Sequence, residues 1–197
     1  IYKVSTYHYN WHGETEILIL LKGRIEMSCN SEVFTMEPLD TIIISPQVGH
    51  ATLALEQDTT ALVIHVGKDF FQQFDPNFIM YQFMIRSDET NRYNPFFTSV
   101  RHHAAMMMLL MVDGKSPANQ LWLEHHYLDL ASVVYSEIES VKSIPSNTKP
   151  ADMTEATFDK MITYIDTNYQ RKIELEDIAQ IGGYNLNYTS QFFKRQL

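Results

Sequence analysis

The sequence predicts an α+β protein in which a small β-sandwich or barrel comes first and helices follow. Residues 1 to about 66 contain short apolar or alternating runs separated by turn residues, a pattern typical of such all-β units. From about residue 69 the apolar residues recur every three or four positions, which is the period of amphipathic helices. The segment 143–150, rich in Pro, Ser, Asn and Thr, indicates a linker before a last helical region.

The composition is that of a folded, acidic chain. Of its 197 residues 45% are hydrophobic, and only seven are Gly and seven Pro, which excludes a disordered or collagen-like protein. Fifteen Lys and Arg against 24 Asp and Glu give a net charge of −9, so any contact with nucleic acid must be local. The one cysteine, Cys29, excludes a disulfide within the chain and fits a reducing compartment. Because the longest apolar run, Ala104–Val112, is too short to span a bilayer, we expect a soluble, cytoplasmic protein.

The expected strands are apolar, alternating or β-branched runs bounded by turns. They are Ile17–Leu21, Arg24–Cys29, Glu32–Met36, Thr41–Ser45 and Thr60–Val66. Turns are expected at Cys29–Ser31 and at Glu37–Asp40, where Asn30 and Pro38 break the apolar pattern. The sequence places no partner for Cys29 as a nucleophile.

Two antiparallel helices are expected next. Asn94-Pro95 starts a helix that runs to Val112, and Ser116-Pro117 starts a second one with an N-cap residue before a first-turn proline. The second helix carries an apolar stripe, which fits either a dimer seam or packing against the chain's own strands. The stripe contains Leu121, Leu128, Ala131, Tyr135 and Ile138. Adjacent histidines occur at 102–103 and 125–126, and neither pair binds a metal alone because neighbours on a helix diverge by about 100°.

The end of the chain has a helix-turn-helix pattern. A helix is expected at about 155–168, with a candidate capping box at Thr154–Thr157, and it precedes a short helix at 173–181. Gly182-Gly183 then supplies a turn before a helix at Asn187–Gln196 that turns Tyr188 and Phe192 inward. The polar residues expected on its outer face suit base edges and phosphates, although an ordinary helical hairpin has the same pattern. They are Asn187, Thr189, Ser190, Gln191, Lys194 and Arg195.

Three segments of this region resemble the AraC/XylS family of bacterial transcription activators. They are Ile162–Tyr169, Ile173–Ala179 and Gly183–Arg195, and the last contains the family's Ser-x-x-Phe-Lys core at 190–194. Gln191 replaces the usual Arg, and Leu186 replaces a common Pro. The family domain has two helix-turn-helix units, so the chain resembles a regulator that ends after the first. Residues 151–197 carry five Lys and Arg against seven Asp and Glu, a net −2, and we expect weak DNA binding by this fragment alone.

The first part resembles a cupin-like barrel (a double-stranded β-helix), which is the sensor domain of the same family. Asn10-Trp-His12, Glu16 and Gly23 have the spacing of the first cupin motif, with Asn10 in place of a histidine. Leu39-Asp40, Pro46 and His50 resemble a degraded second motif. In cupins that bind a metal, histidines and a glutamate hold it. Because Asn is a weak metal ligand, we expect no metal and no cofactor here.

We expect these polar residues to anchor a small-molecule effector, a sugar at the family level. His8, Asn10 and His12 are expected to alternate along one face of a strand. An alternative is that some are ordinary polar groups of the barrel. The candidate ligand-binding residues are His8, Asn10, His12, Glu16, Arg24 and His50, and the candidate DNA-binding residues are Asn185, Asn187, Tyr188, Ser190, Gln191, Lys194 and Arg195.

The resemblance therefore implies a ligand-responsive, sequence-specific DNA-binding regulator, an activator of carbohydrate-utilisation genes, and not an enzyme. The expected parts are a sensing barrel at 1–68, a helical region at 69–142, a linker at 143–152 and a half DNA-binding domain at 153–197, in a homodimer. Two alternatives stay open. One is a metallocupin enzyme, a dioxygenase or isomerase with an unrelated helical tail, and the other is a regulator controlled by protein contact rather than by a small molecule.

Overall fold

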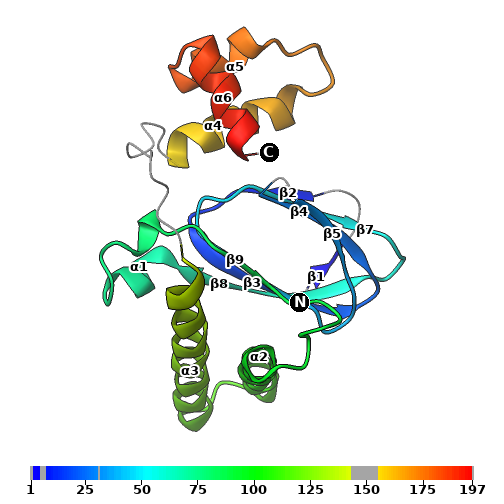
Figure 1. Ribbon diagram of the computed structural model, residues 1–197, viewed down its shortest axis with the longest axis vertical. Coiled ribbons are helices and arrows are strands. Elements are labelled where there is room, and N and C mark those ends of the chain that lie inside the picture. The colour runs from blue at the N-terminus through cyan, green and yellow to red at the C-terminus, as the bar shows by residue number, and fades with distance from the viewer. Residues whose placement is uncertain (1, 5–7, 31, 143–154, 197) are drawn as a thin grey trace.

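Two antiparallel sheets face each other in the first part of the chain, as the computed structural model shows (Figure 1). The structure describes residues 2–4, 8–30, 32–142 and 155–196. One sheet has the order β1 (Tyr2–Lys3), β8 (Thr60–Gly67), β3 (Glu14–Lys22), β6 (Thr41–Ile44) and β9 (Met84–Arg86). The other has the order β2 (His8–Asn10), β7 (His50–Ala54), β4 (Ile25–Cys29) and β5 (Glu32–Met36). We call these strands and their connections, residues 2–86, the two-sheet region.

Strand β3 lies between two hydrophobic layers because its side chains alternate in direction. Leu18 and Leu20 pack between the sheets with Met27 and Ile42, whereas Ile17 belongs to the layer that the helices cover. Both layers are fully buried at β3, which explains why this strand has a continuous apolar sequence and not an alternating one.

Strand β9 was not predicted from the sequence, which placed residues 69–142 in a helical region. It follows the short helices α1 (Lys68–Gln72) and η1 (Phe78–Met80) and pairs with β6, with Ile85 opposite Ile43. The two-sheet region therefore extends past residue 68. A buried ion pair fixes the connection that follows, since Arg92 donates to both carboxylate oxygens of Asp40 at 2.8 and 3.0 Å.

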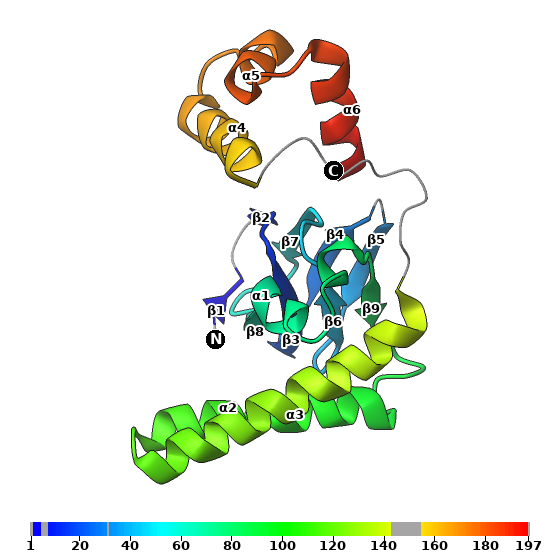
Figure 2. The ribbon, with the colours of Figure 1, turned by 90° about the vertical axis from the view of Figure 1, so that its left-hand side faces the viewer.

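Helices α2 (Pro95–Asp113) and α3 (Pro117–Val141) form an antiparallel pair, here called the helical hairpin. Both predicted starts are confirmed. The Asn94 side chain accepts a hydrogen bond from the Phe97 amide, and Ser116 accepts one from Asn119, so each helix begins with a capped amide and a first-turn proline. The two helices run side by side under the sheets and extend beyond them at one end (Figure 2).

One half of the apolar stripe of α3 packs against the strands, and the other half is exposed to solvent. Its C-terminal half is buried against the strands, as Ala131 and Ile138 show. Its N-terminal half lies on the part of the hairpin that extends beyond the sheets, where Leu121 and Leu128 are 70% and 51% exposed. Packing on the chain's own strands is therefore confirmed for the second half only. No helix in the described part of the chain is long and apolar enough to cross a bilayer.

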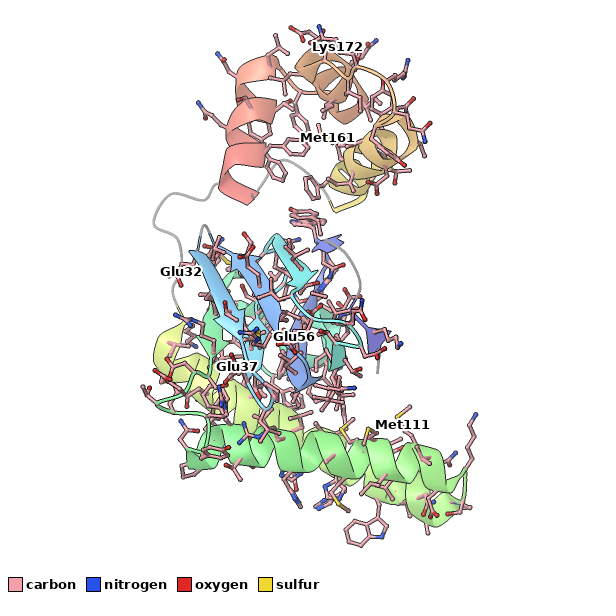
Figure 3. All side chains as sticks on the ribbon, turned by 90° about the vertical axis from the view of Figure 1, so that its right-hand side faces the viewer. Glu32, Glu37, Glu56, Met111, Met161 and Lys172 are labelled. Atoms are coloured by element: carbon pink, nitrogen blue, oxygen red, sulfur yellow. The ribbon has the colours of Figure 1, made fainter. Side chains whose placement is uncertain are left out.

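Helices α4 (Glu155–Asn168), α5 (Leu175–Gly182) and α6 (Leu186–Gln196) form a separate group on the other side of the sheets from the hairpin (Figure 1). Phe158, Met161 and Phe192 are buried at its centre, and Figure 3 shows Met161 among the three helices. Thr189 was expected on the outer face of α6, but it is fully buried, because it follows Tyr188 by one position and precedes Phe192 by one turn. The expected linker at 143–152 and Thr154 of the expected capping box lie outside the described residues.

The turn between α5 and α6 depends on Gly183, whose φ of +72° lies in the left-handed region. Its added Cβ would meet no neighbouring atom, so only backbone strain opposes an alanine there. We expect Gly183→Ala to lower the free energy of unfolding of α4–α6 by about 1 kcal/mol, measured by urea denaturation with helical circular dichroism. Gly183→Asn, which tolerates this conformation, is expected to lose less. Equal stability of the alanine variant would contradict the left-handed turn.

Candidate functional site

Four ionisable side chains meet at one end of the space between the two sheets. Glu16 lies near the start of β3, and His65 lies opposite it on β8 in the antiparallel register. His50 begins β7 in the other sheet, and His12 lies in the connection between β2 and β3. We call these four residues the histidine–glutamate cluster.

Glu16 is the centre of the cluster. Its Oε2 atom is 3.0 Å from His12 Nε2, 3.0 Å from His65 Nε2 and 3.4 Å from His50 Nε2. The side chains of Glu16 and His50 are 3% and 0% exposed, whereas those of His12 and His65 are 20% and 48% exposed. The cluster therefore has a buried floor of Glu16 and His50 and an accessible rim of His12 and His65.

The cluster keeps Glu16 ionised. Burial alone would raise its pKa, but hydrogen bonds from His12 and His65 and the closeness of the His50 ring outweigh that effect and hold the pKa well below its usual range. The pKa of His65 is raised, chiefly because its ring donates to Glu16, although partial burial opposes this. A buried carboxylate held in this state is typical of binding and catalytic sites and occurs also in structural ion pairs.

His50 presents an unusual arrangement to Glu16. Its Nδ1 atom is 3.0 Å from the Val48 carbonyl oxygen, so Nδ1 carries a proton and donates. In the neutral ring, Nε2 then has a lone pair that faces the Glu16 carboxylate at 3.4 Å, with no hydrogen-bond partner. Two acceptors face each other unless a proton, a hydroxyl donor or a cation lies between them. This geometry suits a ligand that brings such a group.

Other polar atoms near the cluster are also buried without a hydrogen bond. The second oxygen of Glu16 is unpaired, and Thr52 Oγ1 lies two residues after His50 on the same face of β7. Buried polar atoms in folded proteins are nearly always paired with protein, water or ligand. Together they offer donors and acceptors of both kinds at one end of the two-sheet region.

The structure brings some predicted ligand residues together and not others. His12, Glu16 and His50 meet, and Asn10 is the residue of β2 that pairs with His50. His12 does not continue the strand as expected, because β2 ends at Asn10 and the His12 carbonyl accepts from Gln47 in the next connection. The backbone of His8 lies on β2, but its side chain is outside the described set.

Arg24 is not part of the cluster. It follows the opposite end of β3 from Glu16, is exposed, and donates to Glu56 at 2.6 Å. The structure therefore does not bring Arg24 to the other candidate ligand residues, because most of the nine-residue strand β3 lies between it and Glu16. Its ion pair with an exposed partner is the solvated role that such strand arginines commonly have.

His65 was missed from the sequence. It belongs to the predicted strand Thr60–Val66, where Ala61, Val63 and His65 share the face that points between the sheets. The sequence does contain a signal for it, since His65 is a polar residue on an otherwise apolar inward face of the predicted strand. Only the register with β3 places it opposite Glu16.

The cluster also contains a set of atoms that could hold a cation. Ligand atoms of His12, Glu16 and His50 all lie within 4.8 Å of one another, which is the arrangement of an imidazole–carboxylate metal site with three protein ligands. Asn10 stands where the cupin pattern has a third imidazole. Cys29 is buried beside His50 in the strand register, and burial raises the pKa of its thiol to about 12, so it is no nucleophile at neutral pH.

The predicted DNA-binding residues lie on α6 and the turn before it. Asn185, Asn187 and Gln191 are exposed, and Ser190 is half-buried. The Asn185 side chain accepts from the Tyr188 amide at 2.9 Å, so it caps the helix. Tyr188 is half-buried, and its ring stacks on Tyr184 with centroids 4.7 Å apart. The side chains of Lys194 and Arg195 lie outside the described set.

An aromatic contact joins the histidine–glutamate cluster to the C-terminal helices. Trp11, between Asn10 and His12, contacts Phe158 of α4 with ring centroids 4.4 Å apart. Phe158 in turn contacts Phe192 of α6 with centroids 5.2 Å apart. A continuous line of rings therefore leads from the residue beside the cluster to the last helix.

This arrangement of two antiparallel sheets and helices is similar in fold to AraC-like transcription regulators. One of them is the AraC-like transcriptional activator CuxR, which aligns with a TM-score of 0.50 and 10% identity over 95% of this chain and 66% of that one. ToxT from Vibrio cholerae aligns with a TM-score of 0.45 and 12% identity in its complex with an unsaturated fatty acid, over 99% of this chain and 72% of that one.

The chain spans slightly less than two thirds of CuxR. At 10% identity the likeness establishes a shared fold and not a shared activity. No family model and no curated protein matches the sequence.

Proposed function

We propose that the chain is the sensing part and the first helix-turn-helix of a ligand-responsive transcription regulator that binds specific DNA sequences. The observation that carries this proposal is the α5–turn–α6 unit. Two short helices are joined through a left-handed glycine, and the second helix turns Asn187 and Gln191 outward. This is the form in which a recognition helix enters the major groove of DNA.

The exposed side chains of α6 suit base recognition. Asn and Gln read adenine through paired hydrogen bonds, and they lie at the start and the middle of the helix, from which a recognition helix contacts base edges. Asn185 and Asn187 also line a shallow surface hollow with Gln180 of α5. The backbone of Lys194 and Arg195 continues α6, and these residue types suit phosphate contacts.

We propose the histidine–glutamate cluster as the effector site, with Asn10 at its edge. A polyol such as a sugar supplies hydroxyls that both donate and accept, which the unpaired atoms of Glu16, His50 and Thr52 require. A hydroxyl between Glu16 and His50 would donate to one of them and relieve their facing acceptors. His12 and His65 are the accessible side of the site.

The Trp11–Phe158 contact is the proposed route from the effector site to the DNA-binding helices. Trp11 is covalently next to His12, so a ligand that moves His12 changes the surface on which α4 rests. The ligand must bind one arrangement of the helices more tightly than another, because equal affinity shifts no population. In the full protein, two such arms in a homodimer would raise the local concentration of the second arm at a half-site.

The exposed end of the helical hairpin is the proposed dimer surface. Leu121, Trp122 and Leu128 on α3 and Met111 on α2 are all more than half exposed, although they are large apolar side chains. Such a group commonly marks a protein contact. The proposed parts of the chain are a sensing domain made by the two sheets and the hairpin, a linker at 143–152, and the helix-turn-helix unit from 153 onward.

The effector site is tested by a thermal-shift screen of monosaccharides, disaccharides and carboxylic acids. We expect one compound to raise the Tm, since a ligand at about 100 times its Kd stabilises a protein by about 2.7 kcal/mol. His12→Ala should lose most of that increase, and His125→Ala, an exposed histidine on α3, should keep it. A screen without a stabilising compound, or equal shifts in the two variants, would count against the site.

A metallocupin enzyme is the second candidate, and the convergence of His12, Glu16 and His50 is the observation that favours it. Metal analysis separates the two proposals. Stoichiometric iron, manganese or zinc that is lost in Glu16→Gln would support the enzyme. A regulator controlled by a small molecule requires no metal at Glu16.

A further inference from the structure

A second group of histidines lies outside the proposed effector site, in the helical hairpin. His102 and His103 belong to α2, and His126 faces them from α3. Ring nitrogens of all three lie within 4.8 Å of one another. The residues pass from exposed His102 through half-buried His103 to buried His126, which is 8% exposed. The group therefore opens from the helix interface toward solvent.

The distance between His103 and His126 is the key observation. Their Nδ1 atoms are 3.1 Å apart, and two nitrogens at that distance share at most one proton. Two nitrogens bound to one tetrahedral zinc ion at about 2.0–2.1 Å lie about 3.3 Å apart. The pair is thus already spaced almost as two ligands of one ion, and the ion would replace the shared proton. His102 is exposed, so rotation of its side chain can bring in the third nitrogen.

We propose that His102, His103 and His126 bind one zinc ion or a similar late first-row divalent cation, with water in the remaining position. Three imidazoles from two helices provide the borderline nitrogen ligands that such ions prefer over magnesium or calcium. Two adjacent histidines of one helix do not suffice, and the third ligand comes from the helix that crosses them.

A neighbouring ion pair lies outside the proposed ligand set. Asp129 is 3.3 Å from His125 Nε2, so this carboxylate and this histidine pair with each other and not with the three proposed ligands.

A metal at this position would join α2 to α3 beside the proposed dimer surface. The Trp122 ring stacks on His126 with centroids 6.2 Å apart, and Trp122 is 57% exposed. The ion would hold His126, and with it the surface that Trp122 presents. The site would thereby favour one arrangement of the exposed end of the hairpin.

Calorimetric titration of the metal-stripped chain with zinc chloride tests the proposal. We expect one ion per chain, and we expect His103→Gln to weaken binding by more than about 100-fold, since even loss of a residue that only orients a ligand costs about 10- to 100-fold. His102→Gln changes an exposed position that is compatible with folding, and it should weaken binding as well. His125→Gln is the matched control and should bind as the unchanged chain does.

Three results would overturn the proposal. The first is no saturable zinc binding at micromolar concentrations. The second is unchanged binding in both His102→Gln and His103→Gln. The third is loss of binding in Glu16→Gln with retention in His103→Gln, which would place the ion in the histidine–glutamate cluster.

Discussion

Phe158→Ala is expected to lower the free energy of unfolding of helices α4–α6 by about 3–5 kcal/mol. Phe158 is fully buried, and in the described part of this helical core Met161 and Phe192 are the only other large hydrophobic side chains that are comparably buried. Removal of its ring leaves a cavity that so small a core cannot fill. The substitution also removes the surface on which Trp11 rests. Amide hydrogen exchange, resolved by segment, measures the effect in the helices and in the sheets separately.

The matched control for this prediction is Tyr169→Ala. Tyr169 follows α4 and is 70% exposed, so its loss should change the stability by less than about 0.5 kcal/mol. In a Trp122→Phe background, the fluorescence of Trp11 should shift to longer wavelength in Phe158→Ala, because its ring becomes accessible to water. Unchanged exchange in α4–α6 together with unchanged Trp11 emission would contradict the packing described above.

Glu16→Gln is expected to destabilise the two-sheet region by about 3 kcal/mol near pH 6. The substitution removes the buried negative charge that the histidines of the cluster surround. The folded-state pKa of Glu16 is lower than its ordinary value of 4.5, so its stabilisation is present above that pH and declines as the pH falls below it. The pKa of His65 is raised above 6.5, so its contribution is full below 6.5 and declines as the pH rises through the folded value.

The stability difference between the unchanged chain and Glu16→Gln should therefore be largest between about pH 4.5 and 6.5 and should decrease on both sides. The decrease above pH 6.5 is the smaller one, because the His65 side chain is 48% exposed and solvent screens it. Urea denaturation across this pH range measures it. Glu56→Gln, which breaks the exposed pair with Arg24, should leave the stability almost unchanged at every pH, because solvent screens this pair. A stability difference between the two proteins that does not vary with pH would contradict the proposed charge network around Glu16.

The helical half of the fold was largely predictable because its signals are local. Asn94-Pro95 and Ser116-Pro117 start helices through capping bonds that involve neighbouring residues only. The glycine turn at Gly183 is local in the same way. Strand β9 was missed because three residues are too few to show an alternation of apolar and polar residues. The segment forms a strand because it pairs with β6.

The histidine–glutamate cluster was predictable in part. The spacing of His12, Glu16 and His50 indicated a shared site, and the structure brings these residues together. The place of His65 in the cluster follows from the register of β8 with β3, which the spacing of residues along the sequence does not reveal. The distance of Arg24 from the cluster follows from the length of β3, which the spacing does not reveal either. The cross-helix histidines are a similar case, because His126 meets His103 only through the crossing of α2 and α3.

Selection of DNA from a pool of random duplexes by the purified chain, at low salt and high protein concentration so that weak binding is retained, is the decisive test of the proposed DNA recognition. We expect the chain to enrich a recurring sequence. Gln191→Ala should relax the preference at one or two of its positions by about 1–3 kcal/mol, whereas Gln170→Ala, an exposed glutamine outside α6, should select the same sequence as the unchanged chain. Enrichment of no sequence, or an identical preference in Gln191→Ala, would contradict it.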